Sequence, residues 1–172
     1  MSKELSFAIP ILISAVSLVI SIYVAYRTWR FNDKSLRRAA WQEHANSLFT
    51  LDKILIDNPD LWSIYDTHPL SNSKSMDPLM EAKREALIYF HFNLFDAVYA
   101  YYKFLIKKDQ IDDKYWESWC KFAYIFFRDC SEAREIIVEP NTQEIYSSEF
   151  VSYIKTIIGQ SKVGKFNFQE LI

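Results

Sequence analysis

The chain has 172 residues, of which half are hydrophobic and 17% aromatic, and its net charge at neutral pH is −2. The charge is uneven: residues 1–38 carry six Lys or Arg and two Asp or Glu, whereas the rest carries 14 and 20. This acidic remainder argues against charge-driven nucleic-acid binding, which needs a basic surface; no DNA partner is expected, and a local RNA site stays open.

The first element is an uncharged stretch near the start of the chain. Leu5 to Tyr26 has 22 residues without a single Asp, Glu, Lys, Arg or His. As a helix it would span about 33 Å, enough to cross a hydrocarbon core of about 30 Å. It ends in aromatic and basic residues rather than in a cleavage site. We therefore expect a retained membrane span, anchored by Tyr23, Tyr26, Arg27, Trp29 and Arg30.

Small hydroxyl residues recur along this span. A spacing of three and four residues runs from Pro10 to Thr28. It places these residues on one face of a helix, here called the serine stripe: Pro10, Ser14, Ser17, Ser21, Val24 and Thr28. Such stripes bring membrane helices together, although serines also bond back to their own helix carbonyls. We expect a helix–helix or water-facing surface, with pore-lining candidates Ser14, Ser17, Ser21, Thr28, Phe31 and Arg38.

The flanking charges predict the orientation of the span. Only Lys3 and Glu4 precede it, whereas five Lys or Arg and one acid, Asp33, follow it by Arg38. Because positive flanks stay cytoplasmic, the N-terminus should lie outside and the C-terminal domain in the cytoplasm. We divide the chain into the transmembrane helix with its basic flank (1–38), a cytosolic helical domain (39–159) and a tail (160–172).

The scarcity of glycine, found only at 159 and 164, predicts an all-α fold. Pro10 is the only helix breaker between Phe7 and Ile56, so one helix of about 50 residues should continue out of the membrane and stop at Asn58-Pro59. Asp60 should then cap a short helix, Leu61–Tyr65. Residues 67–76 read as a surface loop in which His68 has no evident partner.

Further helices are expected beyond this loop. Asp77-Pro78 should open one that runs to about Lys108, with an inward face made of Leu87, His91, Leu94, Val98, Tyr101 and Leu105. Asp112 or Asp113 should cap an aromatic-rich helix that is central or faces another subunit. A short helix or a kinked continuation, 131–138, should stop at Glu139-Pro140. The last helix should begin at Ser147 or Ser148 and end at Gly159, with the tail docked on a neighbour or loose.

The sequence offers little chemistry. Cys120 and Cys130 lack the companions of a zinc site or a disulfide framework, so both should be free thiols. No metal and no cofactor are expected.

The one catalytic candidate is Arg84…His91, an R-x6-H pattern that places both residues on one helix face. His91 could supply acid–base help and Arg84 charge stabilisation. Alternatively, His91 packs in the helix interface and Arg84 makes a surface ion pair, and no catalytic residue is then expected.

These features resemble a known family. An N-terminal span, a basic flank and a small acidic helical domain with R-x6-H look like the HEPN-like membrane accessory protein of type VI-B CRISPR systems. HEPN ribonucleases usually carry Asn, Asp or His after the motif's Arg, where this chain has Glu85. The resemblance implies a HEPN-like bundle and a ring-shaped pore in a bacterial inner membrane. It also implies depolarisation of the cell in antiviral defence, downstream of an RNA-guided ribonuclease.

Three functions are therefore considered. The first is a homo-oligomeric membrane pore, supported by the serine stripe, in which the chain's partners are its own copies and the lipid bilayer. The second is a membrane-tethered ribonuclease that pairs Arg84 and His91 across a dimer. The third is a non-catalytic adaptor that brings a cytosolic partner to the membrane. The stripe favours the pore, and we do not expect an enzyme.

Overall fold

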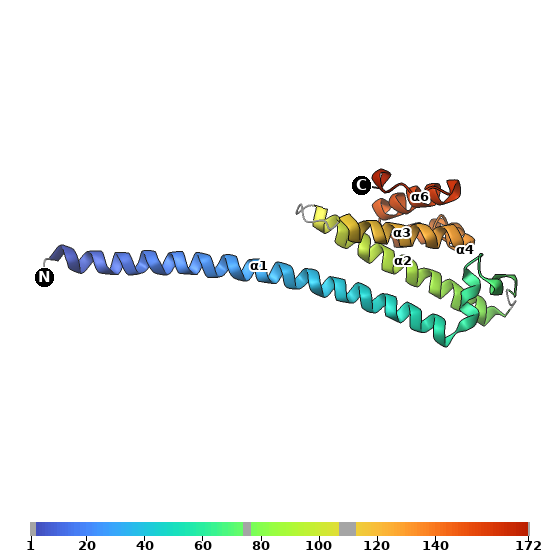
Figure 1. The fold of residues 1–172 in the computed structure, drawn as a ribbon, viewed down its shortest axis with the longest axis horizontal. Coiled ribbons are helices and arrows are strands. Elements are labelled where there is room, and N and C mark those ends of the chain that lie inside the picture. The colour runs from blue at the N-terminus through green and yellow to red at the C-terminus, as the bar shows by residue number, and fades with distance from the viewer. Residues whose placement is uncertain (1–2, 74–76, 107–112, 172) are drawn as a thin grey trace. The chain divides into compact units, whose positions relative to one another are not determined.

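The computed structural model describes residues 3–73, 77–106 and 113–171, and all regular structure in these ranges is helical, as expected (Figure 1). The chain divides into two compact units, Met1–Ala45 and Asn46–Ile172. The described residues of the first unit belong to one helix, which continues into the second unit, and the second unit has its own hydrophobic core.

Helix α1 runs without a break from Lys3 to Asp57. This confirms the expected continuous helix, with Pro10 tolerated near its start. The helix ends where Asn58 turns the chain: its backbone N–H and its side-chain Nδ2 both donate to the Ile54 carbonyl, at 3.0 and 3.1 Å. Pro59 follows and cannot donate a further helical hydrogen bond.

The segment after α1 differs from the expectation. A 3₁₀ helix, η1, spans Pro59–Ile64, and Asn58 rather than Asp60 occupies its N-cap position, because proline fits the first turn of a helix. A second 3₁₀ helix, η2 (Pro69–Ser73), lies where a loop was expected. His68 also has partners: its Nδ1 accepts from the Leu70 N–H at 3.2 Å, and its ring stacks on Trp62.

Helix α2 (Pro78–Ile106) opens as predicted, because Asp77 Oδ1 accepts a hydrogen bond of 3.1 Å from the Leu79 N–H. The expected inward face is buried at Leu87, His91, Leu94 and Val98 and half-buried at Tyr101. The side chain of Leu105 and residues 107–108 lie outside the described residues. A second buried row widens this face: Ile88, Phe92, Phe95, Tyr99 and Tyr102.

The aromatic helix α3 (Asp113–Asp129) is central, which was one of its two expected placements. It lies between α2 and α6 (Ser148–Val163) in Figure 1, and its Phe126 and Phe127 are fully buried. The proposed cap at Asp112 lies outside the described residues.

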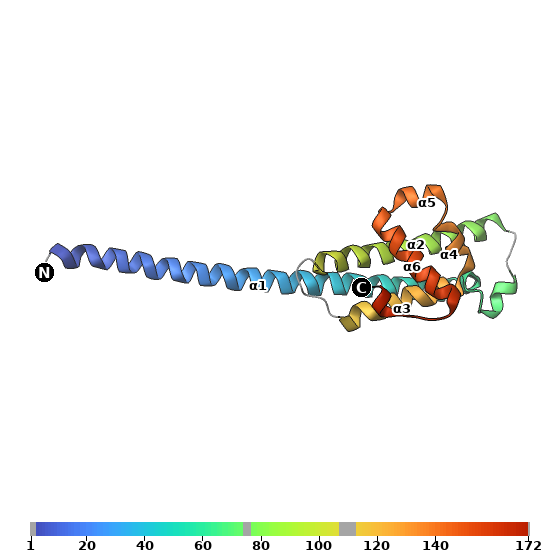
Figure 2. The same ribbon diagram turned by 90° about the horizontal axis from the view of Figure 1, so that it is seen from above.

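Two short helices follow α3. α4 spans Ser131–Ile136, and its first turn is held by a distant carboxylate: Asp66 accepts from the Ser131 N–H and hydroxyl at 2.7 and 2.9 Å. α5 spans Pro140–Ile145 at the edge of the domain (Figure 2). Pro140 was expected to stop a helix, but it opens this one from the first position, where its missing N–H costs nothing.

The last helix begins as predicted and ends later. Ser147 caps α6 by accepting from the Phe150 N–H at 3.2 Å. The predicted end at Gly159 is wrong, because the helix continues to Val163 and Gly164 takes the left-handed conformation, with φ 71°. The Lys165 N–H then reaches the Gln160 carbonyl at 3.3 Å, which satisfies an otherwise open acceptor.

The tail packs against its own domain. Phe166 contacts the Tyr124 ring, with centroids 5.3 Å apart, and Leu171 is buried. The Gln160 amide holds the backbone of Asn167 at both ends, with hydrogen bonds of 3.0 Å to its N–H and 2.9 Å to its carbonyl.

Candidate functional sites

His91 lies on α2 with no solvent exposure. Its Nδ1 is 2.8 Å from the Leu87 carbonyl. A carbonyl only accepts, so Nδ1 carries the proton and the opposite nitrogen, Nε2, accepts from the Tyr65 hydroxyl at 3.3 Å. The imidazole also stacks on the Phe126 ring, with centroids 4.1 Å apart. Both nitrogens and one face of the ring are therefore used inside the protein.

Burial decides the protonation of this histidine. Desolvation disfavours the charged imidazolium and lowers the pKa of His91 to about 4, against a small opposing effect of the hydrogen bond to Leu87. Burial also raises the pKa of its partner Tyr65 above the ordinary value. At neutral pH the pair is uncharged and suits packing, not proton exchange with a substrate.

Arg84 lies two turns earlier on α2 and is 7% exposed. Its Nε is 3.6 Å from Glu132 Oε2 on α4, an ion pair longer than a good hydrogen bond. Nε and Nη1 are buried and have no hydrogen-bond partner among the described residues. This arrangement favours the alternative in which both residues are structural. It differs from that expectation in one respect, because Arg84 is buried and its partner Glu132 is partly buried, so the ion pair does not lie on the surface.

The sequence did not identify the partners of this pair. Tyr65 stands in the segment after α1 and Glu132 on α4, and neither carries a local pattern that points to α2. Tyr65 and Glu132 reach His91 and Arg84 because their segments fold back onto α2. The only signal in the sequence was that Tyr and Glu are residue types that can pair with His and Arg.

The serine stripe lies on the first unit, along α1. The described side chains of residues 12–32 are all exposed. Ser14 Oγ donates to the Pro10 carbonyl and Ser21 Oγ to the Ser17 carbonyl, each at 2.8 Å. The hydroxyl protons thus bond back within the helix, and the oxygen lone pairs still face outward as acceptors. Of the other pore-lining candidates, Thr28, Phe31 and Arg38 are exposed as well.

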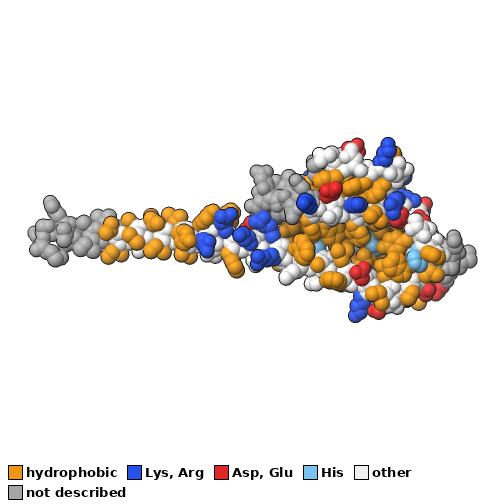
Figure 3. Space-filling view, in the orientation of Figure 1, with side chains coloured by type: hydrophobic (Ala, Val, Ile, Leu, Met, Phe, Trp, Pro, Cys, Tyr) orange, Lys and Arg blue, Asp and Glu red, His pale blue; other side chains and the backbone are white. Residues whose placement is uncertain are grey.

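The predicted anchor follows the apolar stretch. Figure 3 shows hydrophobic side chains along this helix succeeded by a cluster of Lys and Arg. Tyr23, Tyr26 and Trp29 are exposed, and the rings of Tyr26 and Trp29 lie 6.3 Å apart. The Arg30 guanidinium lies 5.7 Å from the Tyr26 ring centre. An open hollow of about 490 Å³ is lined by Tyr26, Arg27, Thr28, Arg30, Phe31 and Lys34.

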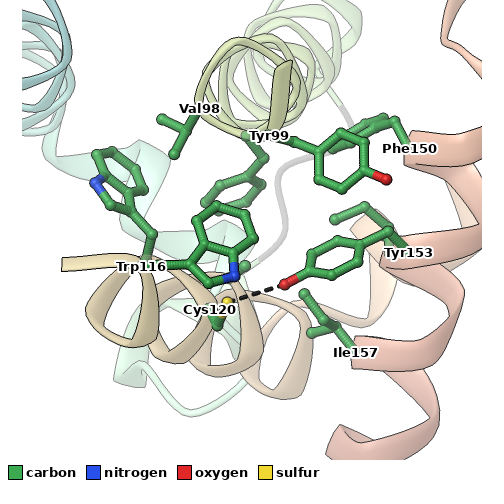
Figure 4. A pocket seen from close by; sticks show the side chains of 11 residues that line it. Val98, Tyr99, Trp116, Cys120, Phe150, Tyr153 and Ile157 are labelled. Carbon is green, nitrogen blue, oxygen red and sulfur yellow. Dashed lines mark hydrogen bonds between the residues drawn. The ribbon is translucent and has the colours of Figure 1, made fainter. Parts of the chain in front are cut away.

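A third candidate is an apolar cavity between α2, α3 and α6 (Figure 4). The Tyr153 hydroxyl points at the Cys120 sulfur, 2.9 Å away. Burial raises the pKa of the Cys120 thiol to about 12, and that of Cys130 likewise to about 12. The cavity measures about 20 Å³, room for one water molecule and no ligand. Both cysteines are free, as expected, and buried.

Metal ligands do not gather in the described parts of the chain: no group of three His, Cys, Asp or Glu lies together there. Comparison of the chain with protein-family models, with curated proteins and with solved structures found no match.

Proposed function

We propose that this chain is a single-span membrane protein whose copies assemble through their spans into a pore. The observation that carries the proposal is the uniform exposure of an apolar helix. Residues 12–32 expose large hydrophobic side chains on the faces of α1 outside the serine stripe, among them Leu12, Leu18, Val19 and Ile22 at 60% or more. An exposed apolar surface of this length supports a membrane span, because the helix is long and apolar enough to cross a bilayer.

The two sides of the span differ in a way that suits a pore. The serine stripe presents hydroxyl oxygens along one face, and Ile, Leu and Val occupy the others. In a ring of such helices, the stripe would line water and the apolar faces would contact lipid and neighbours. Phe31, about 60° from the stripe centre at 100° per residue, would constrict the cytoplasmic mouth. The basic flank supports an orientation with the N-terminus outside and the domain in the cytoplasm.

The alternatives have less support. A ribonuclease built on Arg84 and His91 would need both side chains to reach RNA, and both are buried. A membrane adaptor needs only the span and a partner surface, and it gains support if no pore activity is found. The placement in a bacterial inner membrane, the antiviral role and the upstream RNA-guided ribonuclease rest on the family resemblance and stay predictions.

Leakage from liposomes tests the pore. Ser17→Leu and Ser21→Leu replace hydroxyls by apolar bulk on the stripe, which would narrow and dry the lumen. We expect both variants to insert and to keep the oligomer mass, but to lose dye and ion leakage. Leu18→Ser, one position around the helix, should still leak if it inserts. Val19→Leu adds bulk about 180° from the stripe centre, at 100° per residue, and should leak normally.

Three results would overturn the pore. The first is leakage that is unchanged in both serine variants, and the second is no leakage from the natural protein in any state tested. The third is a detergent-solubilised particle whose protein mass equals one chain of 20.4 kDa. Any of them would leave the adaptor as the better account.

A further inference from the structure

Three cations gather on one face of α1 immediately after the apolar stretch. We propose that Arg27, Arg30 and Lys34 bind the phosphodiester headgroup of an anionic phospholipid, of the phosphatidylglycerol class, in the leaflet that the basic flank faces. This rests on the proposed span, and it adds a specific partner for the anchor region.

The spacing brings the three cations together. Positions 27, 30 and 34 are separated by three and four residues, so they fall within about 60° of one another around the helix. Together they line the open hollow of about 490 Å³, which Tyr26 and Phe31 bound with aromatic rings. A hollow with cationic walls and an aromatic border suits a headgroup that carries negative charge on one side and continues into apolar chains on the other.

The charges in this hollow are available for an outside anion. Among the described residues, no Asp or Glu forms an ion pair with Arg27, Arg30 or Lys34, whereas the neighbouring Arg37 pairs with Asp33. Arg30 lies over the face of Tyr26, which orients a guanidinium without neutralising it. Two guanidinium groups and one ammonium can therefore surround a phosphate with charge-assisted hydrogen bonds.

The position of the hollow favours a lipid over a soluble anion. Its first residue, Tyr26, is the last residue of the uncharged stretch, so the hollow begins at the depth where hydrocarbon gives way to headgroups. Its three cations also point about 130° away from the serine stripe, at 100° per residue. If the stripe faces a lumen, these cations face the surrounding bilayer, and Thr28 and Phe31 form the edge of the hollow that lies nearest the lumen.

Lipid binding to the full-length protein tests the proposal. The protein in a neutral detergent is titrated with short-chain phosphatidylglycerol or phosphatidylcholine, and bound lipid is counted by native mass spectrometry. The variant R27Q/R30Q/K34Q is compared with K83Q/K121Q/K162Q, which removes the same charge from exposed positions of the domain. We expect preference for phosphatidylglycerol in the natural protein and the control, and about a hundredfold weaker binding in the first variant, at roughly fivefold per cation.

Several outcomes would overturn it: equal binding of both lipids, unchanged phosphatidylglycerol binding in R27Q/R30Q/K34Q, or an equal loss in the control. Millimolar inorganic phosphate that displaces the lipid completely would assign the site to a free anion instead. Preferential binding of single-stranded RNA over phosphatidylglycerol would assign it to nucleic acid.

The failure of this site and the failure of the proposed pore can be told apart. If the natural protein leaks dye but the triple variant binds phosphatidylglycerol normally, only the lipid site is wrong. If the lipid preference holds and no leakage occurs, only the pore is wrong. If the protein is extracted from vesicles by alkaline carbonate, the span itself is wrong and both proposals fall.

Discussion

The His91 imidazole and the Phe126 ring lie face to face, with centroids 4.1 Å apart and planes inclined by 13°. The stack joins α2 to α3 at the centre of the domain, and the Tyr65 hydroxyl closes the edge of the imidazole from the segment after α1. A residue that the motif offers as a catalyst is thereby part of the core. The fold requires His91 to stay neutral, and it does not need this residue to transfer protons.

This arrangement predicts acid sensitivity. The pKa of His91 is lowered to about 4 in the folded state from 6.5, so the unfolded chain takes up a proton first as the pH falls. The stability that the neutral His91 imidazole contributes is fully present above pH 6.5 and is lost between pH 6.5 and 4. From pH 7 to pH 5 the free energy of unfolding should fall by about 2 kcal/mol through this residue.

Denaturation of the full-length protein at pH 7 and pH 5 measures the effect, with His91→Gln as the comparison. The variant should be less stable at pH 7, since it loses the ring stack, yet it should lose less stability on acidification. A decline as steep in the variant as in the natural protein would refute the assignment to His91.

The ion pair between Arg84 and Glu132 should be a stability element. Arg84→Met leaves a partly buried carboxylate without this partner and should cost about 2 kcal/mol, less than for a fully buried pair because Glu132 is 23% exposed. Arg84→Met combined with Glu132→Leu should recover part of the loss. A double-mutant cycle in denaturant should show a coupling of at least about 1 kcal/mol; a coupling near zero would mean that the two residues act independently.

The two glycines should respond oppositely to alanine. Gly159 is exposed inside α6, and an added Cβ would meet nothing within 4 Å, so Gly159→Ala should stabilise by about 0.5–1 kcal/mol through helix propensity. Gly164 has a φ of 71°, so Gly164→Ala should destabilise by about 1 kcal/mol. Thermal midpoints should shift by roughly 2–4 °C in opposite directions. Stabilisation by both changes would place the helix end elsewhere.

The continuity of α1 should matter for assembly. Ala40→Pro removes a backbone donor and clashes with the preceding turn, at a cost of about 3 kcal/mol or more. We expect it to kink the helix and to reduce oligomer formation, as measured by cross-linking in detergent and by helical circular dichroism. Ala40→Gly, which lowers propensity by only about 1 kcal/mol, serves as the control and should assemble. Normal assembly and activity of the proline variant would show that an unbroken α1 is not needed.

Local chemistry made part of this fold predictable. The unbroken α1, the Asp77 cap and the Ser147 cap follow from residue types within one helical turn of the position concerned. The end of α6 was missed because two glycines competed. Gly159 occupies an exposed helical position, and only Gly164 adopts the left-handed conformation that ends the helix. Pro140 was equally ambiguous, since proline both ends helices and begins them.

Contacts between distant segments escaped prediction. The carboxylate that caps α4 belongs to Asp66, 65 residues before Ser131, and no spacing rule connects the two. The burial of Arg84 also escaped prediction, because α4, which carries its partner Glu132, approaches α2 only in the folded chain. The motif therefore showed which residues share a helix face, but not whether that face meets solvent or core.

The enclosure of both cysteines has a practical consequence for the span. Thiolates are the species that react with maleimides, and burial keeps Cys120 and Cys130 covered and protonated at neutral pH. The natural chain should thus be silent to such reagents while it stays folded. Single cysteines introduced from Leu12 to Phe31 can then be labelled one at a time against a clean background. Water-soluble reagents would map which face of the helix meets water, without any change to the domain.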